Sequence, residues 1–284
     1  MKDNKTVLVT GCSSGIGYAT CLLFARKNFT TYASVRDLSK AKKIQEIIKR
    51  EKLPLKVIRL NVNDNESIKI AIQKIISDSG KIDILINNAG YGMFGPIEEI
   101  SLEDIKEQFE TNFFGTIRLI KATVPLMRKQ RSGTIVNISS MVGIFGVPLN
   151  AAYVSSKFAL EGLSESISFE LEGFGIKVIL IEPGVVQTDF FNNLKIKGDD
   201  TKSPYYKLMD RRIAFFKATI NSNVSSSDQV ANTILQAVNS EDPALRYVIG
   251  NDATNSINVR KKLPDREFMN WIREGIFHGK GLTR

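Results

Sequence analysis

The segment Thr10-Gly-Cys-Ser-Ser-Gly-Ile-Gly17 decides the fold of this 284-residue chain, because it joins a short apolar run to an amphipathic one. Lys5 to Thr10 (KTVLVT) predicts a buried strand, and Gly15 to Lys27 predicts a helix that begins inside the glycine-rich turn. A strand that passes through such a turn into a helix is the first half of a β-α-β unit, in which the next strand lies parallel to the first.

Apolar runs alternate with amphipathic segments along the rest of the chain. The apolar runs predict strands at Thr30–Val35, Leu55–Leu60, Ile82–Ile86, Thr134–Ile138, Lys177–Ile181 and Tyr247–Ile249. The segments between them predict helices at Leu38–Arg50, Asn65–Ile76, Leu102–Arg128 and Ala152–Phe174. Consecutively apolar strands separated by helices indicate a parallel sheet covered on both faces. We therefore predict a Rossmann-like, doubly wound α/β fold of about seven strands, in a single domain over residues 1–284.

Each glycine of the turn predicts a different contact. Gly11 would permit the tight turn, Gly15 would let a pyrophosphate approach the backbone, and Gly17 would let helix and sheet pack closely. Free N–H groups and the dipole at the start of the helix favour negative charge there. No Gly-Lys-Ser/Thr follows, so a P-loop is not expected. The turn predicts a dinucleotide site.

The end of the second predicted strand, Ser34-Val-Arg-Asp37, indicates which dinucleotide binds. An acidic residue about 20 positions after the turn would bond the ribose hydroxyls of NAD(H). Val35 stands at that position and Arg36 follows it, and a guanidinium can pair with the 2′-phosphate of NADP(H). Asp37 could reach a ribose or cap the next helix. We predict NADP(H), with NAD(H) as the alternative.

Tyr153 and Lys157 lie four residues apart at the start of a predicted helix and therefore share one face. A cation beside a phenol lowers its pKa from about 10, which predicts a proton donor that works near neutral pH without histidine. The single histidine, His278, lies in the tail. Ser140 and Asn87–Gly90 follow two predicted strands, whose carboxyl ends meet at one edge of the sheet. We expect these residues to converge.

Taken together, these motifs resemble the short-chain dehydrogenase/reductase (SDR) family. Thr10 to Gly17 resembles its TGxxxGIG turn, and Asn87 to Gly90 resembles its NNAG segment. The other matches are Asn112, the set Ser140, Tyr153 and Lys157, and Pro183-Gly184 with Thr188. The resemblance covers about residues 5 to 190 in order. Tyr91–Pro96 and Ser155–Glu161 are most similar to NADP-dependent members that act on steroids, retinoids or similar lipophilic alcohols.

The resemblance implies hydride transfer between a nicotinamide cofactor and a carbonyl or alcohol carbon. Tyr153 would donate or accept the proton, and Lys157 would hold the nicotinamide ribose and lower the pKa of Tyr153. Ser140, favoured over its neighbour Ser139 by family spacing and strand alternation, would hydrogen-bond the substrate oxygen. Asn112 would hold a water that connects Lys157 to solvent.

The resemblance also implies a set of cofactor contacts along the sheet edge, and no metal site. The implied cofactor-binding residues are Gly11, Ser13, Ser14, Gly15, Ile16, Gly17, Arg36, Asn61, Val62, Asn88, Ala89, Gly90, Tyr153, Lys157, Pro183, Gly184, Val186 and Thr188. Asn61 stands where the family usually has Asp beside the adenine.

Two segments lie outside the alternating pattern. Residues from about 190 to 223 predict a helical insertion that covers the substrate, and residues from about 252 to 284 form a C-terminal extension. Apolar side chains beside the family's substrate positions indicate a lipophilic ketone, aldehyde or alcohol; these residues are Gly92, Met93, Phe94, Val142, Phe145, Val147, Phe190 and Phe191.

The formal net charge of +9 is compatible with nucleic acid, an anionic surface or an anionic ligand. The basic residues are dispersed in blocks shorter than five, so we predict a solvated surface, no nucleic-acid partner and no membrane span. Two cysteines without metal spacing fit a reducing, cytoplasmic compartment. Family members are often homodimers or homotetramers. A non-catalytic NADP-binding regulator or redox sensor is the alternative function, although such proteins usually lack the Tyr or the Lys.

Overall fold

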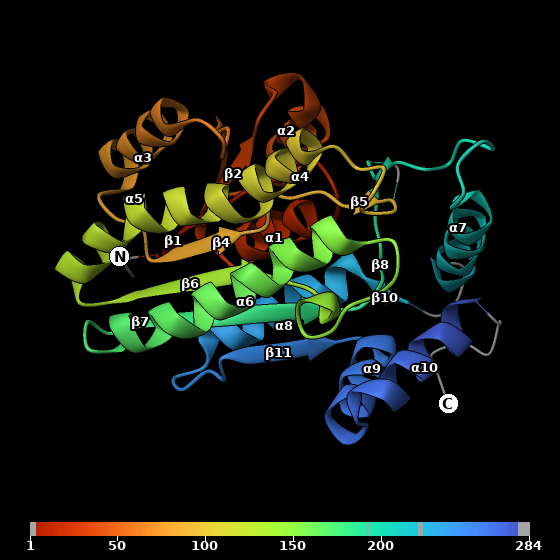
Figure 1. Ribbon diagram of the computed structural model, residues 1–284. Helices are drawn as coiled ribbons and strands as arrows, with labels where there is room; N and C mark the ends of the chain where they lie inside the picture. Colours follow the sequence, from red (N-terminus) through yellow and green to blue (C-terminus); the bar gives the residue numbers. More distant parts are fainter. Residues whose placement is uncertain (1–3, 192, 221–223, 278–284) are drawn as a thin grey trace.

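The computed structural model describes residues 4–191, 193–220 and 224–277 (Figure 1). Seven parallel strands form one sheet in the order β11-β7-β6-β4-β1-β2-β3. These are β1 (Thr6–Val9), β2 (Thr30–Val35), β3 (Leu55–Arg59), β4 (Ile84–Asn87), β6 (Gly133–Ile138), β7 (Ile176–Pro183) and β11 (Arg246–Ile249). The predicted doubly wound sheet is confirmed. Because strand order reverses between β1 and β4, a ligand crevice is expected beyond their carboxyl ends.

Helices cover both faces of the sheet (Figure 1). One face carries α1 (Gly15–Arg26), α2 (Lys42–Glu51) and α8 (Ser227–Asn239), and the other carries α3 (Asn65–Ser79), α4 (Leu102–Phe109), α5 (Gly115–Gln130) and α6 (Ala151–Glu172). Along β1, Val7 and Val9 pack on the α1 side while Leu8 packs on the α3 side. Both faces of the strand are therefore buried, which explains its continuous apolar sequence.

Two predicted helices differ from the observed ones because each contains a turn of another helix type. The stretch 38–50 begins as a 3₁₀ turn, η1 (Leu38–Ala41), whose first turn is capped by Asp37, and only then becomes α2. The stretch 102–128 contains a π-helical turn, η2 (Glu110–Phe114), between α4 and α5. Such π turns often mark functional sites, and this one carries Asn112.

Short strands tie the predicted covering segment to the body. β5 (Met93–Phe94) pairs with β9 (Lys195–Ile196), and β8 (Val186–Gln187) pairs with β10 (Ser225–Ser226). Between β9 and β10 lies α7 (Tyr206–Ile220), which stands at one end of the molecule (Figure 1). The sequence predicted a helical insertion here but not these two-residue strands. Residues 192 and 221–223 of the insertion lie outside the described residues.

The C-terminal extension contributes two helices, α9 (Asn251–Lys262) and α10 (Asp265–Phe277). They pack on the 3₁₀ turn η3 (Met141–Gly143) and the loop after it, where Phe145 meets Phe268 edge to face with ring centres 5.4 Å apart. The predicted extension continues through residues 278–284, including His278, which lie outside the described residues.

In the described part of the chain, each helix is too short or too polar to cross a bilayer. Within the same ranges, His, Cys, Asp and Glu side chains form no group of three that could hold a metal ion. Cys12 and Cys21 are both buried free thiols.

Candidate active site

A cavity of about 1530 Å³ opens beyond the carboxyl ends of β1, β2, β4, β6 and β7. It collects residues that are far apart in sequence, as the strand order predicts. The expected cofactor residues that line it are Gly11, Ser13, Ser14, Gly15, Ile16, Arg36, Asn61, Val62, Asn88, Ala89, Gly90, Tyr153, Lys157, Pro183, Gly184, Val186 and Thr188. Ser140 also lines the cavity, whereas Gly17 and Asn112 do not.

The glycine turn presents an uncapped helix start to this cavity. Gly11 and Gly15 have φ values of 69° and 61°, a backbone region that favours glycine. Ser14 is the N-cap of α1, yet its side chain makes no capping hydrogen bond. The first N–H groups of a twelve-residue helix therefore point toward the cavity without a side-chain acceptor. An anion such as a pyrophosphate fits this position.

The NNAG segment holds the glycine turn in place. Asn88 Nδ2 donates to the carbonyl of Thr10 at 2.8 Å and to that of Gly11 at 3.2 Å. Thr10 Oγ1 accepts hydrogen bonds from the backbone N–H groups of Asn88 and Ala89. A Cβ on Gly17 would lie 2.4 Å from Asn88 Nδ2. Gly17 therefore leaves room for the two Asn88 hydrogen bonds, and it does not itself line the cavity.

Arg36 and Asp37 follow β2 at the edge of the cavity and use their side chains differently. The exposed Arg36 lines the cavity. The Asp37 carboxylate accepts the backbone N–H of Ser39 at 2.9 Å, which lowers the Asp37 pKa. Of the two alternatives left open by the sequence, the structure therefore places Asp37 at the start of η1.

Asn61 keeps its side chain in a local turn, where Oδ1 accepts the Asn63 N–H at 3.2 Å. At the opposite end, Thr188 Oγ1 accepts the Phe190 N–H at 3.2 Å, beside the glycine turn. Sequence reasoning missed Asp252, which accepts the Val185 N–H at 2.7 Å. A Cβ on Gly184 would lie 2.2 Å from the Asp252 carboxylate, so only glycine leaves room for it.

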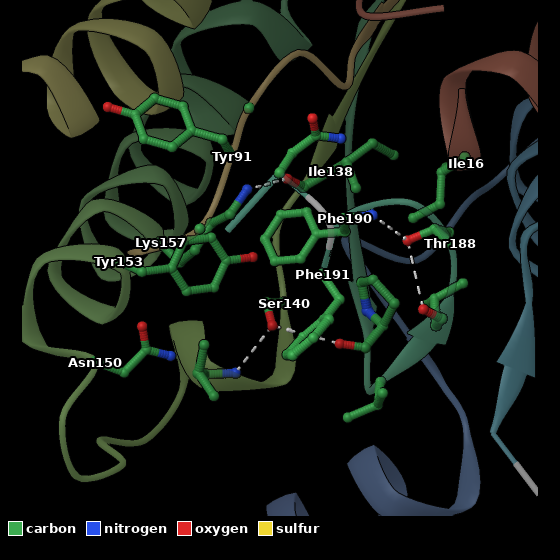
Figure 2. A pocket seen from close by; sticks show the side chains of 18 of the residues that line it. Ile16, Tyr91, Ile138, Ser140, Asn150, Tyr153, Lys157, Thr188, Phe190 and Phe191 are labelled. Carbon is green, nitrogen blue, oxygen red and sulfur yellow. Dashed lines mark hydrogen bonds between the residues drawn. The ribbon is translucent and has the colours of Figure 1, made fainter. Parts of the chain in front are cut away.

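Tyr153 projects from the first turn of α6 toward Ser140 (Figure 2). Ser140 Oγ accepts the Val142 N–H at 3.4 Å and lies 3.5 Å from the Pro183 carbonyl. Burial raises the pKa of Tyr153 to about 12, and hydrogen bonding to Ser140 partly opposes this rise. The Phe190 ring packs edge to face on the Tyr153 ring, with centres 5.8 Å apart. Ser140 rather than Ser139 thus faces the phenol.

Lys157 lies one helical turn after Tyr153, with its ammonium 5.6 Å from the centre of the phenol ring. Its Nζ donates to the Ile138 carbonyl at 2.8 Å. Burial lowers the pKa of Lys157 to about 8, and the charge of Glu161 opposes this change. The Tyr153 pKa is therefore raised rather than lowered as expected, because desolvation penalises both charged forms and dominates each pKa.

Asn112 is buried in the π turn and holds a neighbouring backbone segment. Its Oδ1 accepts the Tyr91 N–H at 3.1 Å, and its Nδ2 donates to the Tyr91 carbonyl at 3.0 Å. Nδ2 also lies 3.3 Å from Ser156 Oγ. Because both amide groups are engaged, the Asn112 side chain positions the chain after the NNAG segment. Its expected role of holding a water stays a prediction.

Behind the site, an arginine joins three carboxylates. Arg246 Nε lies 3.1 Å from Glu161 and 3.3 Å from Glu182, and its Nη2 lies 2.6 Å from Glu165. Burial and the Glu161 charge raise the pKa of Glu182 to about 7. Burial raises the pKa of Glu161, which lies beside Ser139.

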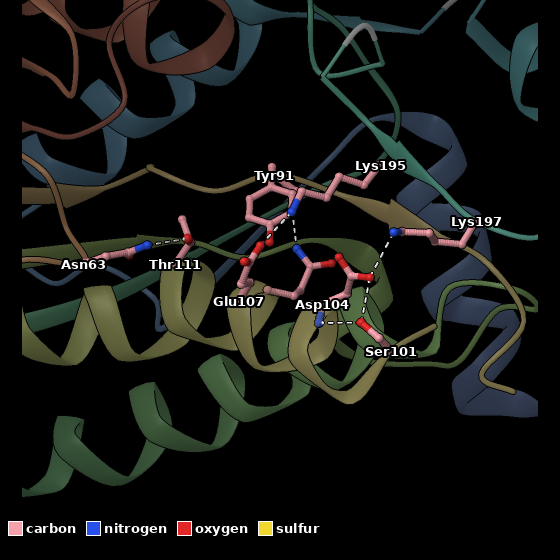
Figure 3. Close-up of polar contacts among 9 residues, drawn as sticks. Asn63, Tyr91, Ser101, Asp104, Glu107, Thr111, Lys195 and Lys197 are labelled. Carbon is pink, nitrogen blue, oxygen red and sulfur yellow. Dashed lines mark hydrogen bonds and ion pairs between the residues drawn. The ribbon is translucent and has the colours of Figure 1, made fainter. Parts of the chain in front are cut away.

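The covering segment is anchored to the rim by polar contacts (Figure 3). Lys195 pairs with Glu107 at 2.8 Å, and Lys197 pairs with Asp104 at 2.9 Å. These ion pairs join β9 to α4. From α7, Arg212 and Phe216 also line the cavity; the sequence predicted a covering helical insertion here but neither of these contacts. Of the apolar residues expected near the substrate, Met93 and Phe145 belong to the buried core instead.

Comparison with known proteins agrees with this arrangement. A sequence model described as short chain dehydrogenase matches residues 5–198. Human retinol dehydrogenase 8 is 38% identical over 254 residues, which are 85% of this chain and 80% of that protein. Rat estradiol 17-beta-dehydrogenase 1 is 34% identical over 257 residues, which are 86% and 73% of the two chains.

Solved structures have the same fold. A short-chain dehydrogenase from Streptomyces avermitilis is 29% identical with a TM-score of 0.82, covering 94% of this chain and 96% of its own. The structure of ElxO with NADP bound is 27% identical with a TM-score of 0.72, covering 87% and 97%. With more than half of its length matched by the family's sequence pattern, the chain belongs to the short-chain dehydrogenases, near the steroid and retinol types, and is an oxidoreductase that uses a nicotinamide cofactor to interconvert alcohols and carbonyl compounds.

Proposed function

We propose that this enzyme uses NADP(H) to interconvert a lipophilic ketone or aldehyde and its alcohol, with Tyr153 as the general acid and base. The observation that carries the proposal is the convergence of Ser140, Tyr153 and Lys157 on the cavity that also contains the uncapped start of α1. NADPH, when bound, supplies the hydride to the carbonyl carbon. The residues of this chain supply the proton, the orientation and the exclusion of water.

In the reducing direction, Tyr153 donates its proton to the carbonyl oxygen as that oxygen becomes negative. The phenol, whose pKa burial raises to about 12, is protonated at neutral pH, and the alkoxide that hydride transfer produces is a stronger base than the phenolate, so the proton moves to it. Ser140 donates a hydrogen bond to the same oxygen and stabilises the developing charge. The Lys157 ammonium stabilises the phenolate that forms, and it is protonated below about pH 8. In oxidation these proton movements run in reverse.

The preference for NADP(H) rests on Arg36 and Asp37. Arg36 lines the cavity and is available to pair with a 2′-phosphate, whereas the Asp37 carboxylate is engaged by Ser39. Because Asp37 caps η1, its carboxylate would have to serve both this cap and the ribose hydroxyls that NAD(H) offers. The structure of ElxO, which is 27% identical to this chain, contains NADP, and this supports the proposal.

The lipophilic substrate is supported by the aromatic walls of the cavity. Phe190 and Phe191 stand beside Tyr153, and α7 adds Phe215 and Phe216. Residues from about 190 to 223 would then cover the substrate, with the extension from about 252 supporting them through contacts of α10 with α7. A homodimer or homotetramer and a cytoplasmic location remain predictions from family membership and cysteine usage.

A substrate screen tests the proposal. Purified protein with NADPH or NADH is offered all-trans-retinal, estrone, decanal and, as a polar control, pyruvate, and cofactor oxidation is followed by absorbance. We expect NADPH oxidation with at least one lipophilic carbonyl compound and none with pyruvate. NADPH binding without turnover of any substrate would instead favour the non-catalytic regulator.

A further inference from the structure

One buried cation in the cavity has no role in the proposed proton transfer. Arg212, on α7, is 5% exposed. Within the described part of the chain, its Nε and Nη1 find no hydrogen-bond partner, and no carboxylate pairs with it. Buried charges in proteins are usually paired, because removing an ion from water is costly. An unpaired guanidinium inside a ligand cavity therefore indicates that a bound ligand supplies its hydrogen-bond acceptor.

Aromatic rings pack around the Arg212 guanidinium but offer no hydrogen-bond acceptors to its Nε and Nη1. Its guanidinium lies 4.6 Å from the centre of the Phe94 ring, 5.7 Å from that of Phe216 and 5.9 Å from that of Phe215. Rings interact with a cation through their faces and leave its N–H edges without acceptors. A planar fork of N–H donors in apolar surroundings is the arrangement that matches a carboxylate.

The acidic side chains of the same rim are already engaged. Glu107 pairs with Lys195 and Asp104 pairs with Lys197 (Figure 3). These two carboxylates neutralise lysines of the covering segment, and Glu99 accepts the Ser203 hydroxyl. The positive charge of Arg212 is therefore left facing the cavity, so this end favours an anion.

A row of packed aromatic rings extends from Arg212 to Tyr153. Phe216 stacks on Phe191 with ring centres 5.4 Å apart, and the adjacent Phe190 packs on Tyr153. A chain-like apolar molecule along this row would have one end at the Tyr153 hydroxyl and the other at the guanidinium. We propose that Arg212 binds a carboxylate at the far end of a lipophilic carbonyl or alcohol substrate, an inference that rests on the proposed function.

Matched substrates test this specificity. The semialdehydes of adipic, azelaic and sebacic acids are compared with their methyl esters, using NADPH and wild-type, Arg212→Met and Arg212→Lys proteins. We expect the wild type to prefer the free acids. Arg212→Met should lower kcat/KM for the acids by about ten- to a hundred-fold, the effect of one hydrogen-bonded charge pair, and leave the esters unchanged. Arg212→Lys should recover part of the loss.

Arg211→Met is the matched control, because Arg211 is an exposed neighbour that lines the same cavity. It removes the same formal charge, so a general electrostatic effect would appear in both variants. We expect it to keep the preference for acids. Equal loss of acid and ester turnover in Arg212→Met, or no acid preference in the wild type, would overturn the inference.

Two measurements separate this inference from the proposed function and from a structural role. Laurate, in the presence of NADPH, should raise the Tm of the wild type but not that of Arg212→Met. That result without turnover of any aldehyde would refute the proposed function and leave the carboxylate site standing. Without ligands, Arg212→Met should melt at or above the wild-type temperature, because an unpaired buried charge is removed. A lower Tm would show that Arg212 is structural and overturn the inference.

Discussion

Tyr153 illustrates what residue spacing predicts and what it leaves out. The spacing of Ser140, Tyr153 and Lys157 was enough to place these three side chains in one cavity. It predicted the wrong direction for the Tyr153 pKa, because spacing records the nearby ammonium but not the burial. Phe190 packs on the phenol ring from a segment outside the repeating pattern. Desolvation depends on such distant contacts, so sequence alone could not give it.

We predict that Arg36 makes the enzyme bind NADPH in preference to NADH. Arg36→Ala should weaken NADPH binding by at least about tenfold, because a charge-assisted pair with the 2′-phosphate is lost. NADH binding should change little, since it has no such phosphate. Fluorescence titration of both cofactors measures the two dissociation constants. Equal weakening of NADPH and NADH binding would show that Arg36 does not pair with the 2′-phosphate.

At the scale of elements, the sequence predicted every strand of the main sheet, because the central strands are largely apolar and buried on both faces. The edge strands β3 and β11 are partly exposed but keep a short apolar core. It missed the π turn within the stretch 102–128. That turn depends on Asn112 bonding the Tyr91 backbone, a contact between segments that periodicity does not record. The two-residue strands β5, β8, β9 and β10 are also too short to leave a pattern.

Gly17 tests the packing of α1 against the sheet edge. Gly17→Ala places a Cβ 2.5 Å from the Gly11 carbonyl and 2.4 Å from Asn88 Nδ2. Either α1 must shift, or Asn88 must move from its hydrogen bonds to the glycine turn. We expect a loss of about 1–3 kcal/mol in the free energy of unfolding, together with weaker NADPH binding. Urea unfolding followed by circular dichroism measures the first effect.

Gly173→Ala, at the end of α6, is the matched control. Gly173 has a φ of −61° and nothing within 4 Å of its added Cβ, so the variant should be as stable as the wild type or slightly more stable. If Gly17→Ala were as stable as Gly173→Ala, the close contact of Gly17 with Gly11 and Asn88 would not be what requires glycine at position 17.

For the whole molecule, the sequence predicted one doubly wound domain but not how its last third closes the site. The arrangement of α7, α9 and α10 rests on contacts such as that of Phe145 with Phe268. It also rests on the cluster in which Arg246 of β11 joins Glu161 of α6 to Glu182 of β7. These contacts join residues far apart in the chain, and no local motif marks them.

The Arg246 cluster predicts a stability that depends on pH. The folded-state pKa of Glu182 is raised from 4.5 to about 7, so the folded protein binds this proton more tightly than the unfolded chain. Stability from this group is therefore complete below about pH 4.5 and decreases as the pH rises toward 7, by on the order of 3 kcal/mol.

Thermal unfolding between about pH 5 and pH 8 measures this effect in Glu182→Gln. The variant should lose less stability than the wild type as the pH rises, because its neutral amide does not ionise. Glu165→Gln, which removes the exposed partner of Arg246, is the control and should keep the wild-type slope. A Glu182→Gln slope equal to that of the wild type would place the titration elsewhere.

The most direct test of the central claim, that Tyr153 transfers the proton, compares turnover with cofactor binding in Tyr153→Phe. With a carbonyl substrate found in the screen, kcat should fall by at least about a hundred-fold, because the acid is removed. The NADPH dissociation constant should stay near the wild-type value, and Tyr205→Phe, outside the cavity, should behave as wild type. Wild-type kcat in Tyr153→Phe would contradict the account.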